Sequence, residues 1–153
     1  MNLVLVGKDK DATIKLKKLI ADYNLKDRVI LTGYLCDREL AALYYSAYCL
    51  VLPSLYEGFG LPAIEAMACS LPVIASDKGS LPEIVDKAGL IVDCKSAESL
   101  ALALIQLIND RNLYDKLRLK GLERAKKFNW NNCALETQKV YQKVVKQYRQ
   151  KPV

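Results

Sequence analysis

The chain has 153 residues, of which 52% are hydrophobic, enough to build the core of one folded domain and too many for an intrinsically disordered chain. No apolar run approaches the roughly 18 to 20 residues of a membrane-spanning helix. The start, MNLVLVGKDK, has neither the charged segment nor the cleavage pattern of a signal peptide. We therefore expect a cytoplasmic protein.

The net charge of +6 is unevenly distributed. Residues 1–110 carry 11 basic and 14 acidic side chains, whereas residues 111–153 carry 12 basic and 3 acidic ones, a balance of +9. The basic last third predicts either a solvated helical face or contact with an acidic partner or an anionic membrane surface, here the inner face of the membrane. Nucleic acid is not expected, because no binding module with interleaved aromatic and basic residues is recognisable.

The cysteines are odd in number, widely spaced and without a CxxC pair, and the chain contains no histidine: Cys36, Cys49, Cys69, Cys94 and Cys133. This pattern predicts reduced thiols used as small core residues in a reducing compartment. A zinc site is not expected, and we predict no metal.

Short apolar runs alternate with amphipathic segments along the whole chain. The runs predict strands at residues 2–6, 28–32, 48–53, 72–76 and 89–93. The segments predict helices at residues 12–23, 37–46, 61–69, 81–86, 97–109, 111–128 and 130–150, with Asp37, Ser96 and Asn129 as caps. Alternating strands and helices indicate an α/β fold, a Rossmann-like parallel sheet with helices on both faces, in a single domain 1–153.

One loop at the carboxyl end of a predicted strand is rich in candidate binding groups. Ligands of open parallel sheets bind at these ends, and Gly58 and Gly60 lie in such a loop, just before a predicted helix. Glycine lets the backbone approach a ligand, and the start of a helix offers free N–H groups and a positive dipole end. The loop therefore suits a diphosphate.

Two carboxylates bracket this loop. Glu57 precedes the glycines, and Glu65 lies about one turn into the predicted helix. A carboxylate has two acceptor oxygens and suits paired hydroxyls, such as those of a sugar or a ribose. The alternative is an ordinary tight turn followed by a solvated glutamate.

The stretch around these residues resembles a known family. Residues 53–69, PSLYEGFGLPAIEAMAC, resemble the signature of group 1 (family-4) glycosyltransferases of GT-B fold, and Glu57 and Glu65 match the spacing of its E-x7-E motif. The segments LPVIAS (71–76), GSLPEIV (79–85), AGLIVD (88–93) and FNW (128–130) are similar to later parts of the family in the same order. The similarity covers nearly the whole chain.

The resemblance implies the C-terminal, nucleotide-sugar-binding half of a GT-B enzyme that transfers a sugar with retention of configuration, without a cofactor or required metal. Glu57 would contact the donor sugar and Glu65 the nucleotide ribose. Further residues would line the donor sugar and diphosphate (Gly58, Phe59, Gly60 and Leu61) or the base (Gly33, Tyr34 and Leu35). The motif specifies neither the sugar, the base nor the acceptor.

The chain also departs from the family pattern. Ser70 replaces the usual glycine after the motif helix, and residues 1–7 are similar to the second strand of the family's domain. The central first strand, its two diphosphate-binding cations and the acceptor-binding domain would then be missing. Lys8 and Lys78 lie on loops near the expected site, but no sequence feature shows that either replaces those cations.

From these departures we expect that the chain alone does not catalyse transfer. The gap in the sheet would close directly, or be filled by a second copy or by a separately made N-terminal half. Two other functions remain open: a non-catalytic nucleotide-sugar-binding or regulatory module, and a GT-B relative such as a sugar-nucleotide epimerase. The E-x7-E loop favours the transferase and the binding module over the epimerase.

Overall fold

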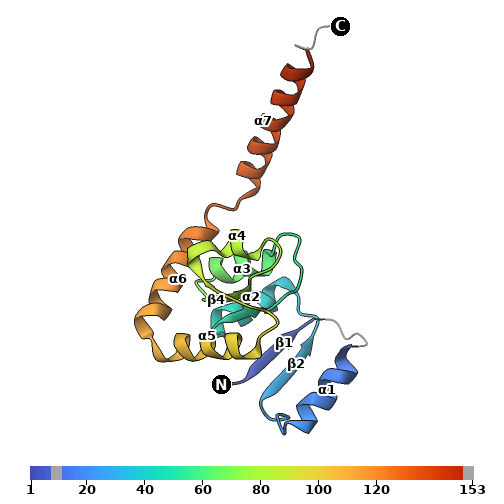
Figure 1. Ribbon diagram of the computed structural model, residues 1–153, viewed down its shortest axis with the longest axis vertical. Coiled ribbons are helices and arrows are strands. Elements are labelled where there is room, and N and C mark those ends of the chain that lie inside the picture. Colours follow the sequence, from blue (N-terminus) through green and yellow to red (C-terminus); the bar gives the residue numbers. More distant parts are fainter. Residues whose placement is uncertain (8–11, 150–153) are drawn as a thin grey trace. The chain divides into compact units, whose positions relative to one another are not determined.

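The computed structural model describes residues 1–7 and 12–149, and the chain divides into two compact units, Met1–Leu43 and Tyr44–Val153 (Figure 1). Lys8, on a loop that was expected near the site, lies outside the described residues, as does the predicted helix end at residue 150. In the described part of the chain, no helix is both long enough and apolar enough to span a membrane.

The first unit contains a two-stranded parallel sheet of β1 (Leu3–Val6) and β2 (Val29–Gly33), with α1 (Ala12–Asp22) between them in sequence. Leu3 is paired with Val29, and the register shifts after Leu5. None of the described side chains before Tyr44 is fully buried, and Leu3, Ile30 and Leu31 remain 37–51% exposed. This unit therefore has little core of its own. α2 (Asp37–Ser46) begins in it.

The second unit is built on a three-stranded parallel sheet of order β3-β4-β5, with strands β3 (Leu50–Leu52), β4 (Val73–Ser76) and β5 (Leu90–Val92). Its helices are α3 (Leu61–Ala68), α4 (Leu81–Val85), the 3₁₀ turn η1 (Asp86–Ala88), α5 (Ala97–Asn109), α6 (Arg111–Ala125) and α7 (Trp130–Arg149). All four residues of the central strand β4 are buried. Parallel sheets with helices on both sides confirm the predicted fold class.

The five described strands form two sheets rather than one. The expectation that the domain's first strand is missing, with its three ways of filling the gap, stays a prediction.

The core of the second unit lies between the sheet and the C-terminal helices. Ile74 of β4 and Val92 of β5 pack with Ala103 and Leu107 of α5 and with Leu117 of α6. At the contact between α3 and α6, a Cβ on Gly121 would lie only 3.2 Å from the Met67 side chain. Glycine therefore allows the two helices to approach closely.

The predicted caps have different outcomes. The Ser96 hydroxyl accepts a hydrogen bond from the Ser99 N–H at 3.0 Å, and the Asn129 side chain accepts one from the Asn132 N–H at 2.8 Å, as predicted. The prediction for Asp37 is wrong, because Asp37 is the first residue of α2. At this helix start the Glu39 carboxylate accepts a hydrogen bond of 2.9 Å from the N–H of Cys36, the residue just before α2.

Ser70 closes α3 in the way that a glycine would. It adopts a left-handed conformation with φ +58°, its N–H donates to the Met67 carbonyl, and the Leu71 N–H donates to the Ala66 carbonyl. These two bonds form the usual glycine-type helix end. The substitution of serine for glycine therefore keeps the geometry at the cost of a less favoured backbone conformation.

Two arginines of α6 bind the carboxyl ends of α3 and α4. Arg118 donates to the Ser70 carbonyl beyond α3 at 3.2 Å. Arg124 donates to the carbonyls of Glu83 and Ile84 in α4 at 2.6 and 3.0 Å. A cation at the C-terminal end of a helix satisfies carbonyls that lack helical partners. α6 thus fixes α3 and α4 relative to the sheet.

The cysteine prediction is confirmed in one respect and wrong in another. All five thiols are free, but Cys36 and Cys133 are exposed and the other three are only partly buried, so none is a true core residue. Cys36 lies just before α2, and Cys133 lies in the first turn of α7. Burial raises the pKa of the Cys49 thiol to about 11, which keeps it protonated and unreactive.

Candidate functional site

The predicted binding loop, residues 53–60, connects β3 to α3 in the second unit. Gly60 precedes the helix with φ +95°, and a Cβ there would lie 2.7 Å from the Leu81 side chain. Pro62 is in the first helical turn, and no side chain caps the helix start. The helix therefore presents an N-terminus that is not occupied by a side chain, with the positive end of its dipole at the loop.

A second loop, after β4, holds the first one in place. The Ser80 hydroxyl lies 2.8 Å from the Phe59 carbonyl and 3.1 Å from the Glu57 carbonyl, and can donate its proton to either. Gly79, with φ +60°, packs so closely that a Cβ would lie 2.9 Å from the Glu57 carbonyl oxygen. Although Ser80 is in the cap position of α4, it makes no side-chain bond to that helix. Its hydroxyl instead fixes the neighbouring loop.

The carboxylate of Glu57 has a defined orientation. The Ser54 hydroxyl donates to Glu57 Oε1 at 2.9 Å. Both residues are partly buried. This bond uses one carboxylate oxygen and leaves Oε2 able to accept hydrogen bonds from a ligand.

The carboxylate of Glu65, in the second turn of α3, contacts a buried phenol. Tyr44 is only 8% exposed, and its hydroxyl donates to Glu65 Oε2 over 3.3 Å, a long hydrogen bond. Burial and the nearby negative charge of Glu65 both raise the pKa of Tyr44. The phenol therefore stays protonated and acts as a donor, while Glu65 itself is exposed.

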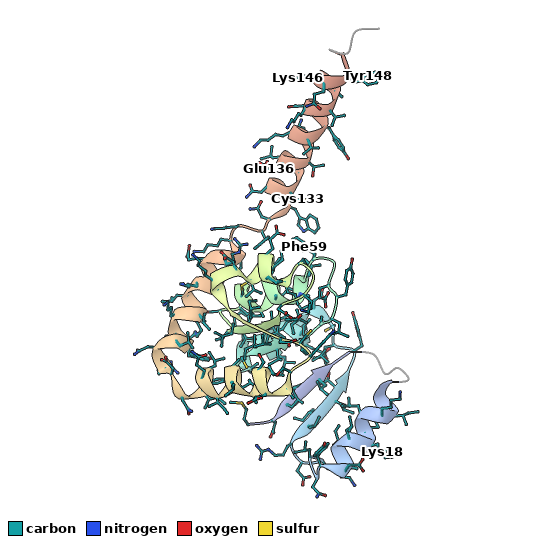
Figure 2. All side chains as sticks on the ribbon, viewed as in Figure 1. Lys18, Phe59, Cys133, Glu136, Lys146 and Tyr148 are labelled. Carbon is teal, nitrogen blue, oxygen red and sulfur yellow. The ribbon has the colours of Figure 1, made fainter. Side chains whose placement is uncertain are left out.

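The side chains of the remaining loop residues are largely exposed. Leu61 is 52% exposed and Phe59 48% exposed, and the Phe59 ring lies edge-on to Phe128 with the centroids 6.0 Å apart. Figure 2 shows Phe59 near the junction before α7. Arg124 stacks over the Phe128 ring at 5.0 Å, so Phe59 has a packing partner that the sequence pattern did not reveal.

The predicted site residues are divided between the two units. Residues 57–61 and Glu65 form one continuous loop and helix start in the second unit. Gly33, Tyr34 and Leu35 lie in the first unit, at and just beyond the end of β2, where Gly33 has φ +71° and Tyr34 is 68% exposed. Sequence reasoning missed Tyr44, Ser54 and Ser80. The three-residue spacing from Ser54 to Glu57 was the one available signal.

The loop after β4 also carries a cation. Lys78 forms an ion pair with Asp77 at 2.6 Å, and this contact raises the pKa of Lys78 and lowers that of Asp77. Ligand atoms of Asp77, Asp93 and Cys94 lie within 4.8 Å of one another. Such exposed acidic groups are common without an ion, and Asp77 already has a partner. The expectation that no metal is needed remains a prediction.

Comparison with known proteins identifies the family. The family described as "Glycosyl transferases group 1" matches residues 1–124. The chain is 41% identical over 109 residues to the O-antigen chain mannosyltransferase B of Escherichia coli, covering 71% of this chain and 29% of that protein. It is 40% identical over 133 residues to the MMP alpha-(1->4)-mannosyltransferase of Mycolicibacterium hassiacum, covering 84% of this chain and 32% of that protein.

A solved structure agrees with this assignment. Sucrose-phosphate synthase from Thermosynechococcus elongatus matches with a TM-score of 0.83 and 37% identity, covering 95% of this chain and 39% of that one. The chain thus spans about a third of the length of the curated relatives it matches. By sequence and by fold it belongs to the group 1 glycosyltransferases, and its architecture is that of the C-terminal half of a GT-B enzyme.

Proposed function

We propose that this domain binds a nucleoside-diphosphate sugar as the donor of a retaining glycosyl transfer. The observation that carries the proposal is the arrangement of loop 53–60, in which an oriented Glu57 carboxylate directly precedes the uncapped start of α3. Membership in the group 1 family supports the enzyme class.

Each part of a donor has a matching group among the predicted site residues. The diphosphate would lie at the start of α3, beside the backbone of Phe59, Gly60 and Leu61, where the helix dipole stabilises negative charge. Glu57 and Gly58 would contact the sugar, and Glu65 would accept hydrogen bonds from the ribose hydroxyls. The family resemblance assigns the base to Gly33, Tyr34 and Leu35, which belong to the first unit. No metal is needed in this scheme.

We expect the chain alone to bind the donor without transferring the sugar. The resemblance assigns the acceptor to an N-terminal half, and positioning the acceptor against the donor is a large part of catalysis. An N-terminal half or a second copy is the partner we propose for the acceptor side. The measurement is sugar transfer by the purified chain, and transfer at the rate of full-length enzymes would overturn this expectation.

Calorimetric titration of the purified chain tests donor binding. The probes are GDP-mannose, UDP-glucose and ADP-glucose; mannose comes first because both curated relatives are mannosyltransferases by name. One of the three should bind, more tightly than the corresponding sugar phosphate. Failure of all three, with the chain folded by circular dichroism, would contradict the proposal. Donor binding without transfer, even with an N-terminal half present, would instead indicate the non-catalytic module.

A further inference from the structure

We propose that two hydroxyl groups outside the E-x7-E motif are positioning residues for its two carboxylates. Ser54 orients Glu57 for the donor sugar, and Tyr44 orients Glu65 for the ribose. The inference rests on the proposed donor site and adds to it the residues that prepare each carboxylate before the ligand arrives.

Ser54 restricts a side chain that would otherwise have several rotamers. The bond from its hydroxyl to Glu57 Oε1 is 2.9 Å, within the usual range for two oxygens. At the same time Ser80 and Gly79 hold the backbone of Glu57 from the other loop. With main chain and side chain both fixed, Oε2 is the acceptor available to a sugar hydroxyl. A preorganised acceptor binds more tightly because less freedom is lost on binding.

Tyr44 acts on Glu65 from a rigid support. Its ring is 8% exposed in α2, so the hydroxyl has a fixed position, whereas Glu65 lies on the exposed side of α3. The distance of 3.3 Å makes this contact weaker than the one at Ser54. It occupies Glu65 Oε2 and leaves Oε1 for the ligand. A phenol is protonated at neutral pH, and burial together with the charge of Glu65 raises the pKa of Tyr44 further.

The two contacts predict different selectivities. Every nucleotide has a ribose, but only the nucleotide sugar has the donor sugar. Removal of the Tyr44 hydroxyl should therefore weaken the binding of a nucleoside diphosphate and of its sugar conjugate by the same factor. Removal of the Ser54 hydroxyl should weaken the binding of the sugar conjugate alone. A general loss of structure would affect both ligands in both variants.

The experiment is a set of calorimetric titrations of the 153-residue chain with GDP and GDP-mannose, or with the UDP or ADP pair if that base is preferred. Tyr44→Phe should lower the affinity for both ligands about three- to tenfold, and Ser54→Ala should lower the affinity for the nucleotide sugar alone by a similar factor. With the 2′,3′-dideoxy nucleotide, Tyr44→Phe should match the wild type. Tyr45→Phe is the control, because Tyr45 is 73% exposed in the same helix.

The variants Glu57→Gln and Glu65→Gln separate failure of this inference from failure of the proposed function. Glu65→Gln should weaken binding of both ligands, and Glu57→Gln should weaken binding of the nucleotide sugar alone. If these losses are found but Ser54→Ala and Tyr44→Phe bind like the wild type, the positioning roles are overturned and the donor site stands. If neither glutamate variant changes binding, the donor site itself is wrong. Equal losses of both ligands in Ser54→Ala, or a dideoxy nucleotide weakened by Tyr44→Phe, would also overturn the positioning roles.

Discussion

Two glycines near Glu57 have different surroundings. Gly79 has φ +60°, and a Cβ there would lie 2.9 Å from the Glu57 carbonyl oxygen, whereas nothing lies within 4 Å of a Cβ on Gly58. Gly79→Ala should therefore destabilise the chain by about 1–2 kcal/mol from its left-handed backbone alone, and displace the Glu57 loop as well. Thermal unfolding measures the first effect and donor titration the second.

Gly58→Ala is the matched control. It lies in the same loop and is not among the glycines with positive φ, so its melting temperature should stay near that of the wild type. A Gly79 variant that melts like the Gly58 variant and binds the donor like the wild type would show that the loop after β4 does not hold Glu57.

At the level of single residues, the sequence predicted the two carboxylates but not the groups that orient them. Glu57 and Glu65 stand out because their spacing and the glycines between them form a local pattern. The contact from Tyr44 to Glu65 joins residues 21 positions apart and depends on how α2 packs. Local patterns also mislead: Asp37 is a good capping residue, but Glu39 makes the bond at that helix start.

At the scale of elements, the apolar pattern located every described strand and α-helix to within a few residues, but not the short 3₁₀ turn η1. The motif helix, predicted at residues 61–69, is Leu61–Ala68. The largest difference is in α6, which was expected to reach residue 128 and ends at Ala125. Beyond the end of α6, the Phe128 ring contacts Phe59 and Arg124. Helical periodicity in the sequence does not predict such a tertiary contact.

α7 is amphipathic, and its described side chains are exposed throughout. Lys139, Lys143 and Lys146 recur at helical spacing on one face, and Tyr141 and Tyr148 lie on the opposite face. Figure 2 shows Lys146 and Tyr148 on different sides of the helix. Such a helix, within a segment of charge +9, favours the anionic surface of a membrane.

We therefore predict weak, salt-sensitive adsorption to vesicles that contain phosphatidylserine, at the inner membrane face in a cell. Co-sedimentation should fall as salt rises, because screening shortens the range of the attraction. The triple variant Lys139→Glu, Lys143→Glu and Lys146→Glu should not sediment, and neutral phosphatidylcholine vesicles serve as the control. Absence of the wild type from the pellet at low salt would favour the solvated-face interpretation.

At the scale of the whole molecule, the two units differ in how much core they have. Residues 73–76 of β4 are all buried, whereas β1 and β2 contain no fully buried residue. The apolar runs in the sequence identify five strands, but they do not determine which of these strands pair. The division into two sheets depends on pairing across the fold.

This difference predicts unequal protection from hydrogen exchange. Amides of β1 and β2 should exchange through local opening well before those of β4, since opening the first unit exposes little buried surface. Exchange followed by mass spectrometry on peptides from residues 1–33 and 70–92 measures the difference. Equal protection of the two regions would mean that the first unit is stabilised as strongly as the second.

The central claim is that loop 53–60 and the start of α3 form the donor site, with distinct roles for its two carboxylates. Calorimetry of Glu65→Gln and Glu57→Gln with a plain nucleoside diphosphate tests it most directly. Loss of a charged hydrogen-bond acceptor should cost Glu65→Gln about 1.5–3 kcal/mol of binding free energy, because the ribose is present in that ligand. Glu57→Gln should bind it like the wild type, since the ligand has no sugar to contact. Equal losses in both variants would contradict the account.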